Sequence, residues 1–175
     1  MKKIALAALA APAALAAYAF GAAALEDRAL TFPSDYKTTF TSYLVADRMG
    51  QEDQIMIMWA NDTARKAARA GEAMPDGSIL IGEIWKAKKD SSGEVIESQI
   101  GRRIPTEMAA IVLMERKASW ADQYPDDMKV GGWEFEVFSP AGENLNKDTT
   151  ACRECHQPLD ATDYTWSHDH IAGGN

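Results

Sequence analysis

The sequence predicts an α+β fold, in which a mainly antiparallel β-sheet of about five strands has helices at its periphery. Two observations support this fold class. Several short apolar segments follow one another through links of hairpin length, which favours antiparallel pairing. Helical patterns lie between and after these segments, and the last helix, near the C-terminus, contains the motif Cys-x-x-Cys-His at residues 152–156.

The first elements are predicted from capping residues and apolar runs. Residues 32–35 contain proline, serine and aspartate, a composition typical of a turn followed by an N-cap. We therefore expect a first helix from Tyr36 into the forties. The apolar run at 54–59 predicts a buried strand. Asn61 is a suitable cap for a helix over 62–70, which Gly71 would end.

The later strands are predicted from alternation and from the turns between them. Residues 75–77, Pro-Asp-Gly, form a turn signature. The charged and small residues at 86–93 predict a hairpin tip. Strands are then expected at 78–85, 94–100, 106–116 and 133–137. Thr149 or Thr150 is expected to cap the helix that contains the motif.

The first 24 residues predict a cleaved signal peptide. A short basic start with Lys2 and Lys3 precedes an uncharged stretch over 4–24, and the small residues at 22–24 suit cleavage. An uncleaved membrane anchor is the alternative, which the high alanine content and Pro12 disfavour. Cleavage would leave a single domain over 25–175, with the periplasm as its expected location.

The charge of this domain argues against binding nucleic acid. Without Lys2 and Lys3, 16 of the 18 basic residues remain against 26 acidic residues, so the net charge is −10. Such a surface repels phosphate. It would attract a basic redox protein, although solubility explains the same charge.

The motif at 152–156 predicts covalent attachment of one haem c. The thiols of Cys152 and Cys155 are three positions apart on one helical turn, where each can form a thioether with a haem vinyl group. The adjacent His156 can then bind the iron as proximal ligand. A thioredoxin-like redox pair is the alternative, but that reading requires a βαβ context, which this sequence lacks.

The chain resembles the cytochrome P-460 family, which includes hydroxylamine-oxidising enzymes and the β-sheet cytochromes c-prime. The matching segments are Tyr36, residues 55–71, 76–83 and 132–138, Pro140, the motif at 152–156, and residues 163–166. Together they extend over essentially the whole expected domain. The resemblance implies one haem in an α+β domain and a homodimeric assembly.

Two departures place the chain closer to the gas-binding cytochromes c-prime. The resemblance implies that hydroxylamine-oxidising members have a haem-linked lysine at the position of Gly82, and glycine has no amine. It also implies a distal carboxylate on the strand over 106–116, where residues 111–114 of this chain are all apolar and the nearest carboxylate, Glu115, is expected at the strand's exposed end. The distal pocket is therefore expected to be lined from Ile111, Val112, Leu113 and Met114. Lys86, Lys88 and Lys89 are expected to be solvated rather than linked to haem.

Other side chains have a functional and a structural interpretation. The methionine candidates for a sixth iron ligand are Met56, Met58, Met108 and Met114, and core packing is the alternative for each. His168 and His170 are expected in a solvated tail rather than at a metal. Arg102 and Arg103 are candidates for pairing with haem propionates, and a solvent-exposed position is an equal alternative.

The sequence therefore predicts a periplasmic mono-haem c-type cytochrome whose five-coordinate iron binds small diatomic gases, especially nitric oxide and also carbon monoxide. Two alternatives stay open: a hydroxylamine or nitrogen-oxide oxidoreductase of the P-460 type, and a six-coordinate electron-transfer cytochrome. Enzymatic activity is left undecided, and a binding protein is favoured.

Overall fold

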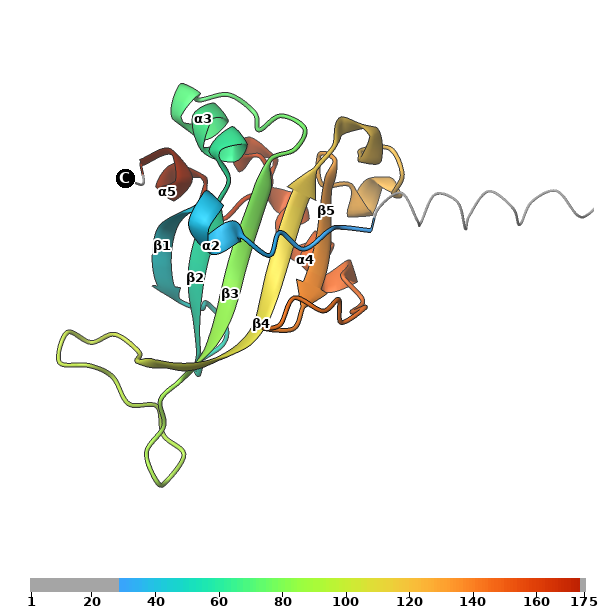
Figure 1. Ribbon diagram of the computed structural model, residues 1–175. Coiled ribbons are helices and arrows are strands. Elements are labelled where there is room, and N and C mark those ends of the chain that lie inside the picture. The colour runs from blue at the N-terminus through green and yellow to red at the C-terminus, as the bar shows by residue number, and fades with distance from the viewer. Residues whose placement is uncertain (1–28, 174–175) are drawn as a thin grey trace, which may run out of the picture.

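The computed structural model describes residues 29–173, which form a five-stranded antiparallel sheet with helices on both faces (Figure 1). The predicted signal peptide lies outside the described residues. The strands are β1 Thr41–Asp47, β2 Gln54–Ala60, β3 Ile79–Ala87, β4 Pro105–Arg116 and β5 Trp133–Phe138, and they pair in sequence order. The α-helices are α2 Tyr36–Thr39, α3 Asp62–Ala70, α4 Thr150–His156 and α5 His168–Gly173. Three short 3-10 helices are η1 Ala118–Trp120, η2 Asp126–Met128 and η3 Gln157–Thr162. The predicted fold class is confirmed.

The prediction for α3 is correct in its boundaries and its capping. The side chain of Asn61 accepts a hydrogen bond from the amide of Ala64, 3.0 Å away. Gly71 ends the helix at φ +70°, in the left-handed region that glycine adopts without strain. Within residues 29–173, no helix has the length and apolar character that crossing a membrane would need.

The prediction of a helix from Tyr36 into the forties is wrong. Helix α2 has only four residues, and β1 begins at Thr41. The hydroxyls of Thr38 and Thr39 donate to the carbonyl of Asp35 and close this short turn. The following residues include β-branched and aromatic side chains, which suit a strand paired with β2.

The predicted return strand over 94–100 is also wrong. Strand β3 pairs with β4, and residues 88–104 form an arm that extends beyond the sheet (Figure 1). The β-pairing within this arm consists of two isolated bridges, between Lys89 and Val95 and between Glu97 and Arg103. Its tip closes where Asp90 accepts from the amides of Ser92 and Glu94.

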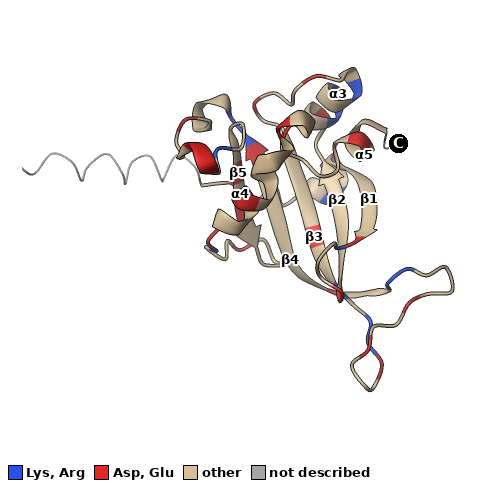
Figure 2. Ribbon diagram, turned by 180° about the vertical axis from the view of Figure 1, so that it is seen from behind, with Lys and Arg blue, Asp and Glu red and all other residues tan. Residues whose placement is uncertain are grey.

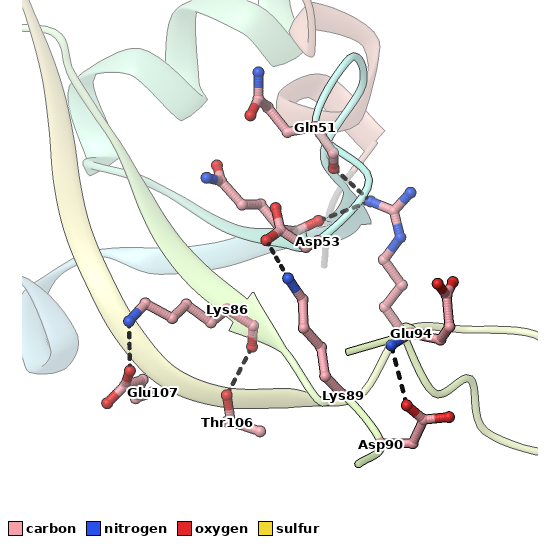
Figure 3. Close-up of polar contacts among 10 residues, drawn as sticks. Gln51, Asp53, Lys86, Lys89, Asp90, Glu94, Thr106 and Glu107 are labelled. Carbon is pink, nitrogen blue, oxygen red and sulfur yellow. Dashed lines mark hydrogen bonds and ion pairs between the residues drawn. The ribbon is translucent and has the colours of Figure 1, made fainter. Parts of the chain in front are cut away.

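The base of the arm is attached to the sheet by polar contacts (Figure 3). Lys89 pairs with Asp53 at 2.9 Å, and Lys86 pairs with Glu107 at 2.6 Å. Arg103 donates to the carbonyl of Gln51 at 2.8 Å. These lysines are exposed and paired with carboxylates, as solvated residues would be.

Strand alternation gives the sheet two unlike faces. Helix α4 lies over one face, which we call the motif face, and α2 lies over the opposite face (Figures 1 and 2). The motif face consists of Leu44, Ala46, Met56, Met58, Gly82, Ile84, Ala110, Val112, Met114, Phe135 and Val137. The opposite face is closed by a core that includes Ile81, Ile111, Leu113 and Phe138, together with Tyr36 and Trp120.

The two faces differ in how well they are covered. On the opposite face, Ile111 and Leu113 are each 1% exposed. On the motif face, most of the apolar side chains, including Met58 and Val112, are only half-buried. A packed core exists there only at one end of the sheet, against α3 and α5. The rest of the motif face is an apolar surface that the described chain does not cover.

Candidate functional site

Helix α4 places the Cys-x-x-Cys-His motif beside the motif face. The helix begins where Asp148 accepts hydrogen bonds from the amide and hydroxyl of Thr150, at 2.9 and 2.7 Å. Thr149 is the N-cap residue, one of the two that the sequence predicted, but its side chain makes no cap bond, and the Asp148 carboxylate accepts from the first turn instead. Pro158 follows shortly after the helix and cannot continue its hydrogen bonding.

A buried ion pair attaches α4 to the edge of the sheet. Arg153, inside the motif, is 2% exposed and pairs with Glu134 of β5. Tyr124 donates to the same carboxylate at 2.7 Å, and its ring lies 3.3 Å from the Arg153 guanidinium. Alternation along β5 predicts that Glu134 is exposed, but it is 4% exposed, because Arg153 supplies its counter-charge. In the sequence, this pair is indicated only by the presence of a carboxylate in the expected strand over 133–137 and an arginine inside the motif.

His156 is held in the orientation that a proximal iron ligand requires. Its Nδ1 lies 2.7 Å from the carbonyl oxygen of Tyr164, and a carbonyl only accepts, so Nδ1 donates. The Nε2 atom therefore keeps its lone pair for a metal. Burial lowers the pKa of His156, which favours the neutral imidazole. Phe135 of the motif face packs against this ring, with centroids 5.1 Å apart.

The two thiols are free and differ in exposure. Cys152 is half-buried against the core beside the motif face, and Cys155 is exposed. Burial raises the pKa of the Cys152 thiol, and the positive charge of Arg48 acts in the opposite direction. Cysteine thiols one helical turn apart, with a metal-competent histidine next to them, can attach a haem to this edge of the sheet.

The motif face fits the body of a haem. A porphyrin ring is flat and apolar, and the half-buried side chains beside His156 offer a broad apolar surface. None of the eleven residues named above is acidic or basic, and strand alternation adds charged residues to this face at the ends of β3 and β4, with Lys86 and Arg116. The hollow beside Tyr36 and Met108, of about 270 Å³, lies on the opposite face and away from the motif. The haem-binding candidate is therefore an open apolar face, not that hollow.

The four predicted distal residues divide between the two faces. Val112 and Met114 are on the motif face, opposite Val137 and Phe135 of β5. Ile111 and Leu113 are on the opposite face, in the closed core. A strand alternates its side chains, so four consecutive residues cannot line one pocket. Only Val112 and Met114 are positioned to contact a haem there.

The predicted methionine ligands divide in the same way. Met56, Met58 and Met114 are on the motif face, and Met108 packs against the core of the opposite face. A Cβ placed on Gly82 would lie 2.5 Å from the terminal methyl of Met56 and 3.0 Å from Val112. Gly82 thus lies at the centre of the motif face, with both neighbours packed over it.

The remaining candidates lie apart from the motif. Arg102 pairs with Asp47 at 3.3 Å, and Arg103 donates to backbone carbonyls of the turn between β1 and β2. Both contribute to a small hollow with Val45 and Ile55 on the opposite face, so neither is positioned for haem propionates. His168 and His170 are in α5, and no group of three potential metal ligands exists within residues 29–173.

Comparison with known proteins gives one family. A family model described as Cytochrome P460 matches residues 33–167, which is most of the chain. The matched segment contains all five strands and the whole Cys-x-x-Cys-His motif. None of the curated proteins matches the chain.

Proposed function

Because the chain belongs to the cytochrome P460 family and is therefore a c-type haem cytochrome, we propose that it binds small diatomic gases, above all nitric oxide. The observation that supports this proposal most directly is the uncharged, half-buried motif face beside a correctly oriented His156. We propose one haem, joined through thioethers to Cys152 and Cys155, with His156 as the proximal ligand.

The protein's own residues then have defined tasks. Tyr164 fixes the tautomer and direction of His156 through its carbonyl. Phe135 packs against the imidazole and limits its rotation. Val112 excludes water from the sheet side of the site. When bound, the haem supplies a ferrous iron whose open position takes a diatomic ligand.

The surroundings support a gas-binding protein over a hydroxylamine oxidase. Substrate oxidation needs a group that moves protons, and the motif face has no carboxylate. Gly82 has no amine that could link to the ring. Lys86 is four residues further along β3, about 13 Å away at the usual strand rise. It is also paired with Glu107.

A six-coordinate electron-transfer cytochrome is the second candidate. Three methionines, Met56, Met58 and Met114, share the motif face and are close enough in the fold to compete for a sixth position. A thioether ligand would hold the iron low-spin and exclude gases unless displaced. The spectrum of the ferrous protein separates the two candidates.

We further propose that the protein is exported to the periplasm through cleavage near residue 24 and that it assembles as a homodimer. The motif at 152–156 supports export, since c-type haem is attached outside the cytoplasm. The acidic surface would favour a basic redox partner.

The proposal is tested by mass and spectrum of the purified protein. We expect a haem peptide with two thioether links, a high-spin ferrous spectrum, and tight binding of nitric oxide and carbon monoxide. A third link to a lysine, or turnover of hydroxylamine with an electron acceptor, would instead support the oxidase. Split low-spin bands that disappear on replacing one methionine would support electron transfer.

A further inference from the structure

The carbonyl that orients His156 belongs to a turn whose backbone is unusual for its residues. Asp163 and Tyr164 are consecutive and have φ +50° and +59°, in the left-handed region. Aspartate is tolerated there, but a bulky aromatic residue rarely adopts this conformation. Such a conformation persists only where the surrounding structure holds it. The contacts of this turn therefore decide where the Tyr164 carbonyl points.

Backbone hydrogen bonds and the Asp163 side chain hold the first half of the turn. The turn ends η3, where the amide of Tyr164 donates to the carbonyl of Leu159 at 2.7 Å. The Asp163 carboxylate accepts from the amide of Met74 at 2.7 Å. Met74 is completely buried in the core against α3 and α5. The turn is thus attached to a residue of the core as well as to its own helix.

The Tyr164 ring is held against Gly131. A Cβ placed on Gly131 would lie 2.3 Å from the Cε2 atom of Tyr164 and 2.7 Å from its Cδ2 atom. The ring therefore lies against bare backbone, in a space that only glycine leaves open. Gly131 also has φ +60°, which glycine adopts without strain. Because the ring is fixed by this contact, the carbonyl of the same residue is fixed with it.

Arg116, at the end of β4, joins the two loops that make these contacts. Its Nε donates to the carbonyl of Gly131 at 3.1 Å, and its Nη1 donates to the carbonyl of Met74. A guanidinium is planar and presents its donors in a rigid arrangement. Arg116 therefore sets the spacing between the loop under the Tyr164 ring and the loop that binds Asp163.

We propose that Asp163, Gly131 and Arg116 are positioning residues for the proximal ligand: they hold the carbonyl that orients it and thereby set the strength of its bond to iron. A firm hydrogen bond from Nδ1 makes the imidazole a stronger electron donor through Nε2. A stronger donor stabilises ferric over ferrous iron, which lowers the reduction potential. The inference rests on the haem attachment and the iron ligand proposed above.

The test compares the wild type, G131A and the control G101A as holoproteins, by redox titration and by the iron–histidine stretching band in the ferrous resonance Raman spectrum. G131A displaces the Tyr164 ring, so the hydrogen bond from His156 should weaken. The band should move to lower frequency, and the equilibrium constant for reduction should rise roughly tenfold, about 59 mV for one electron. Gly101 has φ +69° but nothing within 4 Å of an added Cβ. G101A therefore introduces similar backbone strain without displacing the ring and should match the wild type.

A second set of variants tests the other contacts and does not depend on the folding of G131A. D163N keeps an acceptor for the Met74 amide and a residue that tolerates positive φ, so it should match the wild type. D163A loses both properties and should shift the band and the potential in the same direction as G131A. R116M donates no hydrogen bond to either loop and should shift them in that direction too.

Two results would overturn the inference. One is that haem-loaded G131A, D163A and R116M have the band and the potential of the wild type. The other is an equal shift in G101A or D163N, since a general loosening of the fold would then be responsible. A six-coordinate iron would refute gas binding, and the potential alone would then decide the inference. A wild type without covalent haem would refute the proposed function and the inference together.

Discussion

Removing the buried carboxylate of Glu134 should be the most damaging single change outside the haem motif. In E134L, Arg153 stays 2% exposed without a counter-charge, and Tyr124 loses its acceptor. Breaking a buried pair by removing one partner costs about 3–5 kcal/mol. A domain of this size is stable by roughly 5–15 kcal/mol, so the variant should lose a large part of its free energy of unfolding.

The assay is urea unfolding of the holoprotein, followed by circular dichroism. The control is E136Q, since Glu136 is two residues along the same strand and bonds only to Asn144. The double variant E134L/R153M removes both charges and should recover most of the loss, because apolar replacements of buried pairs are often neutral. If E134L unfolds at the same urea concentration as E136Q, or if the double variant is no better than E134L, the ion pair does not hold α4 to the sheet.

Three further predictions follow from the two faces of the sheet. V112A removes bulk from the motif face and should speed the association of carbon monoxide with the ferrous protein, as measured by flash photolysis. L113A, on the opposite face, should leave that association rate unchanged but lower the free energy of unfolding by about 2–5 kcal/mol. Burial raises the pKa of Glu136 in the folded protein, so ionisation of this carboxyl opposes folding once the pH exceeds its pKa in the unfolded chain. The stability of E136Q in urea should therefore depend less on pH between pH 4 and 7 than that of the wild type. The same pH profile for both proteins would contradict this. Burial raises the pKa of Tyr43 to about 12, so the free energy of unfolding should fall between pH 10 and 12. Y43F should remove the part of this alkaline loss that Tyr43 causes, and it should cost about 0.5–1.5 kcal/mol at neutral pH through the lost bond to Ser167. The same alkaline loss of stability in Y43F and the wild type would contradict this role of Tyr43.

Elements with complete local information were predicted from the sequence. Helix α3 has its cap at Asn61 and its terminating Gly71 within the helix's own segment. Strand β5 alternates from Trp133 to Val137, and its position is as predicted. The haem motif is likewise a local pattern. In such segments, propensity, capping and periodicity agree with the tertiary structure, so no distant residue is needed to choose between structures.

Errors arose where distant residues decide. Residues 41–47 have a capped turn before them and suggest a helix, but pairing with β2 makes them a strand. The burial of Glu134 depends on an arginine 19 residues later. Arg48 faces the motif because β1 pairs with β2 in one register, and a shift by one residue would reverse its face. The register of β4 similarly determines that Val112, and not Leu113, belongs to the candidate site.

The distribution of carboxylates between the two faces provides a physical argument about function. Glu83 is 1% exposed and accepts from Tyr36 and Trp85, and Glu134 binds Arg153; both belong to the opposite face. Each buried carboxylate therefore has its own partners, as burial of a charge requires, and Glu134 is neutralised by an arginine of the motif helix. A group that moved protons at the iron would have to project from the motif face, where the eleven residues named above are uncharged and strand alternation adds the cations Lys86 and Arg116 at strand ends. Because the side chains of β3 alternate, no rotamer change can move Glu83 to the haem side, so acquiring proton chemistry would require a new side chain on the motif face itself.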